Sequence, residues 1–456
     1  MSAGHVPPAD PSEAAWIRLP PIARQVLPNG LTVMVVERRT LPLVTIRLSL
    51  RAGASRDPTD LPGLAAFTAR LLRQGAAARD ARAFAEDIDS IGGHFGAGIG
   101  LDQLTVDGEF TTETWDEGLA LFTEALLAPR FDDDEITRER QRTIAEIAQS
   151  RDDPEHVADR AFQHFLFGSH PYGHPAEGTA ASLERMTRED ILSFHRGRMV
   201  PDGGVLVVVG DVDPDSTLKR VADALSGWSG TGAVPEPPPA APRVTGRRAV
   251  LVHDAGSGQV QYRTGNVGLA RRTPHFHALA LANTIFGGGF TSRLVREARV
   301  NRGLTYGIGS RFLLPMSPGP FVISTFTRNA ALGEMHEVVT SQLATLMSST
   351  LGQDEIDAAR AYVLGMHVRR LETPEALAAS LAETELFGLG LDAITGFRRS
   401  LEAVTAQSCR AAIDAGLPDD SLLTVLVGDK DAVGATAATL GDLTVVEADW
   451  AEGLSP

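Results

Sequence analysis

The chain contains an internal repeat. The apolar run Val205–Asp211 (VLVVVGD) ends in Gly-Asp, and Leu423–Asp429 (LTVLVGD) repeats this pattern 218 residues further on. The triplet Asp134–Ile136 (DEI) returns as Asp354–Ile356 after 220 residues. A strand that ends in Gly-Asp is common, but two markers with nearly equal offsets indicate that one structural unit is used twice.

A Pro-rich segment lies between the two copies. Residues 229–247 (SGTGAVPEPPPAAPRVTGR) hold five prolines within 235–242, beside small residues. Such a segment forms neither helix nor sheet and is typical of a stiff, extended spacer. We therefore predict two homologous domains, residues 1–228 and 248–456, joined by a linker at 229–247.

Each predicted domain mixes strands and helices. Residues 31–37 and 44–50 show strand patterns, with an Asn-Gly turn before the first. Helical spacing of apolar residues covers 63–74, 115–127, 134–149 and 188–195. The Gly-rich run 92–100 is expected to be a weak strand at a sheet edge. The pattern predicts the α+β class, with two domains that each place helices on one face of a mainly antiparallel sheet.

Composition excludes several partners and sites. The net charge of −16 disfavours nucleic acid and an anionic membrane surface, because both attract clusters of Lys and Arg. The single cysteine, Cys409, forms no intrachain disulfide and no Cys-based metal site. No apolar run approaches the ~18 residues that span a bilayer. The N-terminus lacks the pattern of a signal peptide, so we expect a cytoplasmic protein, or a periplasmic one if a leader has been removed.

Several segments of both halves resemble the M16 family of metallopeptidases (pitrilysin-type, inverted zincins). The resemblance is closest to the short bacterial and mitochondrial-processing-type subunits, and it implies an M16/LuxS-like metallohydrolase fold. It extends from about residue 20 to 430 and rests on the segments Leu61–Arg70, Gly92–Gly93, Glu139–Ile147, His170–His174, Gly287–Arg293 and Arg299–Tyr306.

The zinc motif of this family is degenerate here. M16 peptidases carry His-x-x-Glu-His on a helix, where two His one turn apart bind zinc and the Glu acts as general base. The matching positions hold Ala66, Ala69 and Arg70, and only the distal ligand position matches, at Glu146. One carboxylate does not hold zinc, so we expect no metal and no hydrolytic centre in this chain. We also expect Arg70 to pair with Glu146.

Another family feature is retained. An Arg followed seven residues later by a Tyr maps onto Arg299 and Tyr306, and in the family this pair grips the peptide and stabilises the transition state. Both side chains donate hydrogen bonds to a carbonyl oxygen that becomes anionic. In active subunits a Gly-rich edge strand binds peptide by backbone pairing, and here its counterpart includes Gly92, Gly93, His94 and Phe95.

The resemblance implies a function in peptide degradation. The chain would be the metal-free, substrate-binding subunit of a heterodimeric zinc metallopeptidase, inactive alone, with the zinc in an M16 homologue as its partner. The alternative is a catalytically silent assembly or peptide-binding protein of the same fold. A metal at His164, His170 and His174 is disfavoured, because a Pro- and Gly-bearing loop in this place also serves packing. An enzyme of another class would need a constellation that the sequence lacks, since Cys409 has no identifiable His partner.

Overall fold

The structure, a computed structural model, describes residues 4–5, 19–230, 236–418, 420–447 and 450 of the chain. Residues 231–235, which include part of the predicted linker, and most of the first 18 residues lie outside the described part. Two compact units are present. Unit 1 comprises residues 1–145, 176–236 and 366–398, and unit 2 comprises residues 146–175, 237–365 and 399–456.

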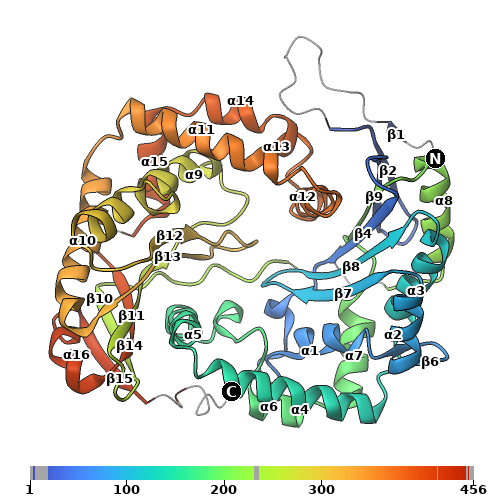
Figure 1. The fold of residues 1–456 in the computed structure, drawn as a ribbon, viewed down its shortest axis with the longest axis horizontal. Coiled ribbons are helices and arrows are strands. Elements are labelled where there is room, and N and C mark those ends of the chain that lie inside the picture. The colour runs from blue at the N-terminus through green and yellow to red at the C-terminus, as the bar shows by residue number, and fades with distance from the viewer. Residues whose placement is uncertain (1–3, 6–18, 231–235, 419, 448–449, 451–456) are drawn as a thin grey trace. The chain divides into compact units, whose positions relative to one another are not determined.

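Unit 1 is built on a seven-stranded sheet (Figure 1). Neighbouring strands of this sheet are antiparallel, except that β3 and β9 run parallel. Along the sheet the order is β1 (Gly4–His5), β2 (Ile22–Val26), β3 (Thr32–Glu37), β9 (Val205–Gly210), β4 (Leu43–Leu50), β8 (Leu104–Thr111) and β7 (His94–Ile99).

The helices of unit 1 come from three parts of the chain. The 3₁₀ turn η1 (Ala54–Arg56) and a small hairpin, β5 (Gly75–Ala76) and β6 (Arg79–Asp80), connect the larger elements. The helices are α1 (Leu64–Leu71), α2 (Ala81–Ser90), α3 (Trp115–Leu127), α4 (Asp133–Ser150, of which residues 133–145 belong to this unit), α6 (Ala180–Arg185), α7 (Arg188–Arg198), α8 (Pro214–Ala224), α12 (Pro374–Leu386) and α13 (Asp392–Thr395).

Unit 2 is built on a six-stranded sheet. Its order is β12 (Ile308–Phe312), β13 (Pro320–Arg328), β11 (Gln259–Val267), β14 (Leu422–Gly428), β10 (Arg247–His253) and β15 (Asp442–Val446). Around it lie α5 (Pro154–Phe167), η2 (Pro171–Gly173), α9 (Phe276–Asn283), the π-helical segments η3 (Thr284–Gly288) and η4 (Val295–Asn301), η5 (Asn329–Ala331), α10 (Leu332–Ser348), α11 (Gln353–Arg369), α14 (Phe397–Glu402), α15 (Ala406–Gly416) and α16 (Lys430–Ala437).

Five strands of each sheet share one topology, as expected for a duplicated unit. In the first, β9 lies between parallel β3 and antiparallel β4, followed by β8 and β7. In the second, β14 lies between parallel β10 and antiparallel β11, followed by β13 and β12. The repeated Gly-Asp strands thus occupy equivalent places, and both repeated DEI triplets lie in the first turn of a long helix, α4 or α11. The predicted α+β class with mainly antiparallel sheets is confirmed.

Each half of the sequence contributes one helix to the sheet of the other half. The second-half helix α12 packs against β4 and β9 of unit 1, and the first-half helix α5 packs against β11 and β14 of unit 2. In unit 1, α12 covers one face of the sheet while α3 and α8 cover the other (Figure 1), so the prediction of helices on one face only is wrong for this sheet. β9 and β14 are buried at every position, which explains why they read as continuous apolar runs rather than alternating ones. The predicted division into residues 1–228 and 248–456, with a linker at 229–247, describes the two copies of the sequence repeat. It stays a prediction.

Residues 237–246 of the predicted linker are held to unit 2 by hydrogen bonds. Neither helix nor strand occurs in residues 236–246. The Pro239 carbonyl accepts a hydrogen bond from His170 Nε2 at 2.6 Å, and the Pro238 carbonyl accepts one from the Ser317 hydroxyl. No described helix is long and apolar enough to span a membrane.

Candidate functional site

The degenerate zinc motif lies on α1, whose start is fixed by a partly buried carboxylate. Asp57 accepts hydrogen bonds from the backbone N–H groups of Gly63 and Ala65, both at 2.7 Å. These N–H groups have no partner within the helix, so Asp57 acts as its N-terminal cap. Burial raises the Asp57 pKa to about 7, against the opposing effect of these two hydrogen bonds. Gly63 has a φ of +90°, and a Cβ there would lie 2.5 Å from Gly178 Cα, so only glycine fits.

The C-terminal end of α1 contacts α4 through an ion pair. Arg70 Nη1 lies 3.4 Å from Glu139 Oε1, and the Glu139 side chain is only 2% exposed. Arg142 Nη2 donates to the same oxygen at 2.7 Å, and Gln74 Nε2 donates to Oε2 at 3.3 Å. A buried carboxylate is stable only when it is paired and hydrogen-bonded. Arg70 therefore helps to neutralise Glu139 on the adjacent helix.

This arrangement does not fit a zinc ion. Ala66 and Ala69 offer methyl groups at the positions of a ligand and of the general base, and Arg70 brings a guanidinium to the position of the other His. A tetrahedral catalytic zinc needs three protein ligands and tolerates no cation among them. Within the described ranges, no group of three or more His, Cys, Asp or Glu side chains could hold a metal ion. No reaction step can be derived through a metal in this chain.

Glu139 was not among the predicted site residues. The predicted partner of Arg70 was Glu146, and that pairing stays a prediction. The two carboxylates lie seven residues, or two helical turns, apart on α4 and so project from the same side of it. That spacing was the available signal. A side chain that faces this side of α4 could pair with either carboxylate, and Glu139 is the one two turns before Glu146.

Arg299 and Tyr306 lie in unit 2, on η4 and on the loop that leads from it to β12. The Arg299 guanidinium carbon lies 4.9 Å from the centroid of the Phe290 ring, in a cation–π contact. Tyr306 is 84% exposed and Phe290 73% exposed. Neither Arg299 nor Tyr306 has a hydrogen-bond acceptor among the residues that the structure describes. Nearby Arg302, in contrast, is paired with Glu297 at 2.7 Å and Glu334 at 3.3 Å.

The loop that carries Tyr306 is rigidly held despite this exposure. Leu304 and Thr305, just before Tyr306, are buried. The Thr305 hydroxyl bonds to both the N–H and the C=O of Gly307, at 3.1 and 3.0 Å, and so bridges Tyr306 from one side to the other. The Leu304 carbonyl accepts from the Thr327 hydroxyl at 2.8 Å. These hydrogen bonds hold the backbone on both sides of Tyr306, and in this backbone conformation the Tyr306 side chain is exposed to solvent.

The predicted substrate-binding segment Gly92–Phe95 leads into β7, an edge strand whose neighbour in the sheet is β8. A Cβ at Gly93 would lie 2.8 Å from the Phe110 ring, so Gly93 permits close packing. Phe95 is buried against the rings of Phe84 and Phe122, with centroids 5.6 and 5.9 Å away. His94 is exposed, and so is the open side of Gly92. In this segment Phe95 packs in the core, and the glycine backbone and His94 form the accessible surface.

Two other candidates have structural explanations. His170 uses both ring nitrogens, since Nδ1 accepts from Tyr172 N–H at 3.1 Å and Nε2 donates to Pro239. Burial lowers the pKa of both His164 and His174. Cys409 is buried, its Sγ lies 3.8 Å from the Ala278 carbonyl oxygen, and burial raises its pKa to about 11. A thiol with so high a pKa is a poor nucleophile near neutral pH.

Comparisons with known proteins agree with this geometry. Residues 32–180 match the family model described as "Insulinase (Peptidase family M16)", and residues 185–363 match "Peptidase M16 inactive domain". Over 405 residues the chain is 27% identical to an uncharacterised zinc protease of Mycobacterium tuberculosis, covering 89% of this chain and 91% of that protein. An uncharacterised zinc protease of Streptomyces coelicolor is 26% identical over 373 residues, covering 80% of each.

Solved structures share the fold over 90% of this chain. The structure of a peptidase M16 inactive domain from Pseudomonas fluorescens superposes with a TM-score of 0.83 at 26% identity, over 90% of this chain and 98% of that one. A protease from Helicobacter pylori shares the fold at 20% identity, with a TM-score of 0.81 over 90% and 100% of the two chains. Since the family models match most of both halves and the fold agrees throughout, the chain belongs to peptidase family M16.

Proposed function

We propose that this chain is the metal-free, substrate-binding subunit of a heterodimeric M16 zinc peptidase. A zinc-bearing M16 homologue would supply the metal, its ligands and the general base. Arg299 and Tyr306 would bind the peptide and donate hydrogen bonds to the carbonyl oxygen under attack. The chain would hydrolyse no peptide alone.

The observation that carries this proposal is the pair of uncommitted donors. A guanidinium and a phenol without acceptors in the described part of the protein stay available to an acceptor on a bound molecule, whereas Arg302 is already paired. Arg299 is instead held over an aromatic ring, and Tyr306 is held in solvent by a fixed loop. Two preorganised donors are suited to an oxygen that becomes anionic in the transition state.

The filled zinc position supports the other half of the proposal. Arg70, at the position of a zinc-binding His, is paired with Glu139 of α4, which Arg142 also contacts. The curated relatives are named zinc proteases, whereas this chain lacks both His and the Glu of their expected motif. Loss of the metal residues together with retention of the peptide-binding pair is what a subunit that works on a partner's zinc requires.

The test is coexpression with a homologue from the same genome that keeps His-x-x-Glu-His. We expect a stable complex that cleaves a quenched fluorescent peptide and is inhibited by a chelator, and no cleavage by this chain alone. In the complex, Tyr306→Phe and Arg299→Ala should each lower kcat by about 10²–10³-fold, the usual effect of losing one oxyanion donor. Arg302→Ala is the matched control, because it removes a neighbouring cation that is already paired.

Any of three results would reject the proposal. Cleavage by the pure chain alone would show that it has its own centre, and unchanged turnover in both the Tyr306→Phe and Arg299→Ala complexes would show that these donors do not act on the substrate. A homologue that is equally active without this chain would also remove its role as a subunit.

A silent peptide-binding or assembly protein is the second candidate. The edge position of β7 favours it, since an exposed edge can pair with an extended peptide. Gly96→Val and Gly98→Val would then weaken peptide binding by the chain alone. Under the first proposal these changes should matter less than the loss of Tyr306.

A further inference from the structure

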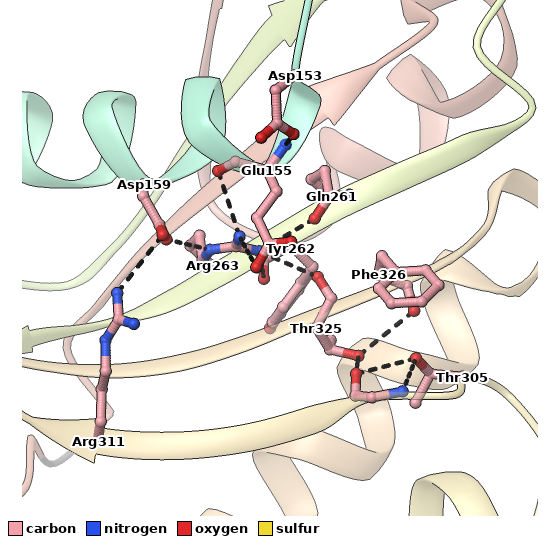
Figure 2. A network of polar contacts seen from close by, with 11 residues as sticks. Asp153, Glu155, Asp159, Gln261, Tyr262, Arg263, Thr305, Arg311, Thr325 and Phe326 are labelled. Carbon is pink, nitrogen blue, oxygen red and sulfur yellow. Dashed lines mark hydrogen bonds and ion pairs between the residues drawn. The ribbon is translucent and has the colours of Figure 1, made fainter. Parts of the chain in front are cut away.

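A buried cation lies at the centre of unit 2. Arg263 on β11 is 1% exposed, and its Nε donates to Asp159 Oδ1 on α5 at 2.5 Å. Its Nη1 donates to the Thr325 carbonyl on β13 at 3.2 Å, and its Nη2 reaches the Glu155 carbonyl at 3.4 Å (Figure 2). A buried guanidinium without acceptors would be strongly destabilising, so this network fixes the positions of α5, β11 and β13 relative to one another.

The same network continues to the loop that carries Tyr306. The Thr325 hydroxyl, on the residue whose carbonyl binds Arg263, donates to the Gly307 carbonyl at 2.8 Å. Gly307 is in turn bridged by the Thr305 hydroxyl (Figure 2). A continuous chain of hydrogen bonds therefore runs from Asp159 through Arg263, Thr325 and Gly307 to Thr305.

A second branch holds the strand that follows the loop. Arg311 on β12 lies 3.6 Å from Asp159 Oδ2. The Asp159 carboxylate therefore contacts Arg263 on β11 and also the edge strand β12, which begins shortly after Tyr306. The contacts come from the exchanged helix α5, which the first half of the sequence supplies to this sheet. The orientation of the Tyr306 loop thus depends on side chains distant in sequence.

We propose that Arg263 and Thr325 are positioning residues for Tyr306. They hold the 304–307 backbone in the conformation that presents the phenol to a bound peptide. This inference rests on the proposed function for its peptide, but the state of the loop can be measured without one.

The experiment uses Thr325→Val in the full chain, because it removes the hydroxyl and keeps the β-branched shape. The fold should survive, since the Gly307 carbonyl keeps the Thr305 hydroxyl as a donor and belongs to an exposed residue that water can also reach. Hydrogen exchange of the 304–307 amides should become about two- to tenfold faster, the range expected for one hydrogen bond. Thr264→Val is the control. It removes a different buried threonine hydroxyl, on β11, which bonds to Thr424 and not to the loop.

Binding of fluorescein-labelled casein, which is unfolded, then links the loop to Tyr306. Thr325→Val should weaken binding by about two- to tenfold in the native background and have almost no effect in the Tyr306→Phe background. A purely structural role would give equal losses in both backgrounds, and that result would overturn the inference, as would unchanged exchange of the loop. If Tyr306→Phe and Arg299→Ala bind casein as tightly as the native chain, the proposed function fails, and the role given to Thr325 falls with it.

Discussion

Removal of Arg70 should loosen the contact between α1 and α4. In Arg70→Ala, Glu139 keeps Arg142 Nη2 at 2.7 Å and Gln74 Nε2 at 3.3 Å, and loses its contact with Arg70 at 3.4 Å. Complete loss of partners for a buried charge costs about 3–5 kcal/mol. Since the lost contact is long and a charged partner remains, we expect about 1–2 kcal/mol of local stability to be lost.

Hydrogen exchange of α1 and of residues 133–145 is the suitable assay, because a protein with two compact units need not unfold in one step. The expected loss corresponds to amides that exchange about 5- to 30-fold faster. The Arg70→Ala and Arg142→Ala double variant should approach the full cost of an unpaired buried charge. In the Glu139→Gln background, where no charge remains to be neutralised, Arg70→Ala should change exchange little.

Arg82→Ala provides the matched control. Arg82 pairs with Glu86 at 2.7 Å on the same unit, but both side chains are well exposed, so its loss should cost at most about 0.5 kcal/mol. If Arg70→Ala exchanges no faster than Arg82→Ala, or if its effect is equally large in the Glu139→Gln background, then Arg70 does not stabilise the place where relatives would bind zinc.

The remaining predictions concern acid sensitivity and the exchanged helices. Burial and the nearby Arg247 lower the His336 pKa from 6.5 to about 4, so the unfolded chain binds the extra proton first and stability should fall as pH drops from about 6.5 to 4. The loss has an upper limit of about 3 kcal/mol, and His336→Gln should flatten this part of a plot of unfolding midpoint against pH. Leu381→Ala in α12 should cost about 2–5 kcal/mol and speed hydrogen exchange in β4 and β9, although these strands belong to the other half of the sequence. Leu166→Ala in α5 should affect β11 and β14 instead, and the reverse pattern would contradict the helix exchange.

Much of the architecture was predictable because it is written in local patterns. Helix α3 has the predicted bounds, Trp115–Leu127, and α4 was found within one residue at each end. Apolar spacing, acidic first turns and turn glycines act over a few residues, so they can be read directly from the chain. The two repeat markers revealed the shared topology for the same reason, since each lies at a matching place in its own sheet.

In the candidate sites, too, local features were predictable from the sequence and long-range contacts were not. The identities of residues 66, 69 and 70 already show that a zinc motif is lost, because metal binding needs particular side chains at fixed helical spacing. That Arg70 binds Glu139 and that Thr325 holds the Tyr306 loop could not be read this way. These contacts join residues far apart in the chain, and so does the packing of α12 and α5 on the sheets of opposite halves. Amino-acid order determined which elements form and which motif residues are replaced, whereas long-range packing and the burial of charge decided which side chains meet.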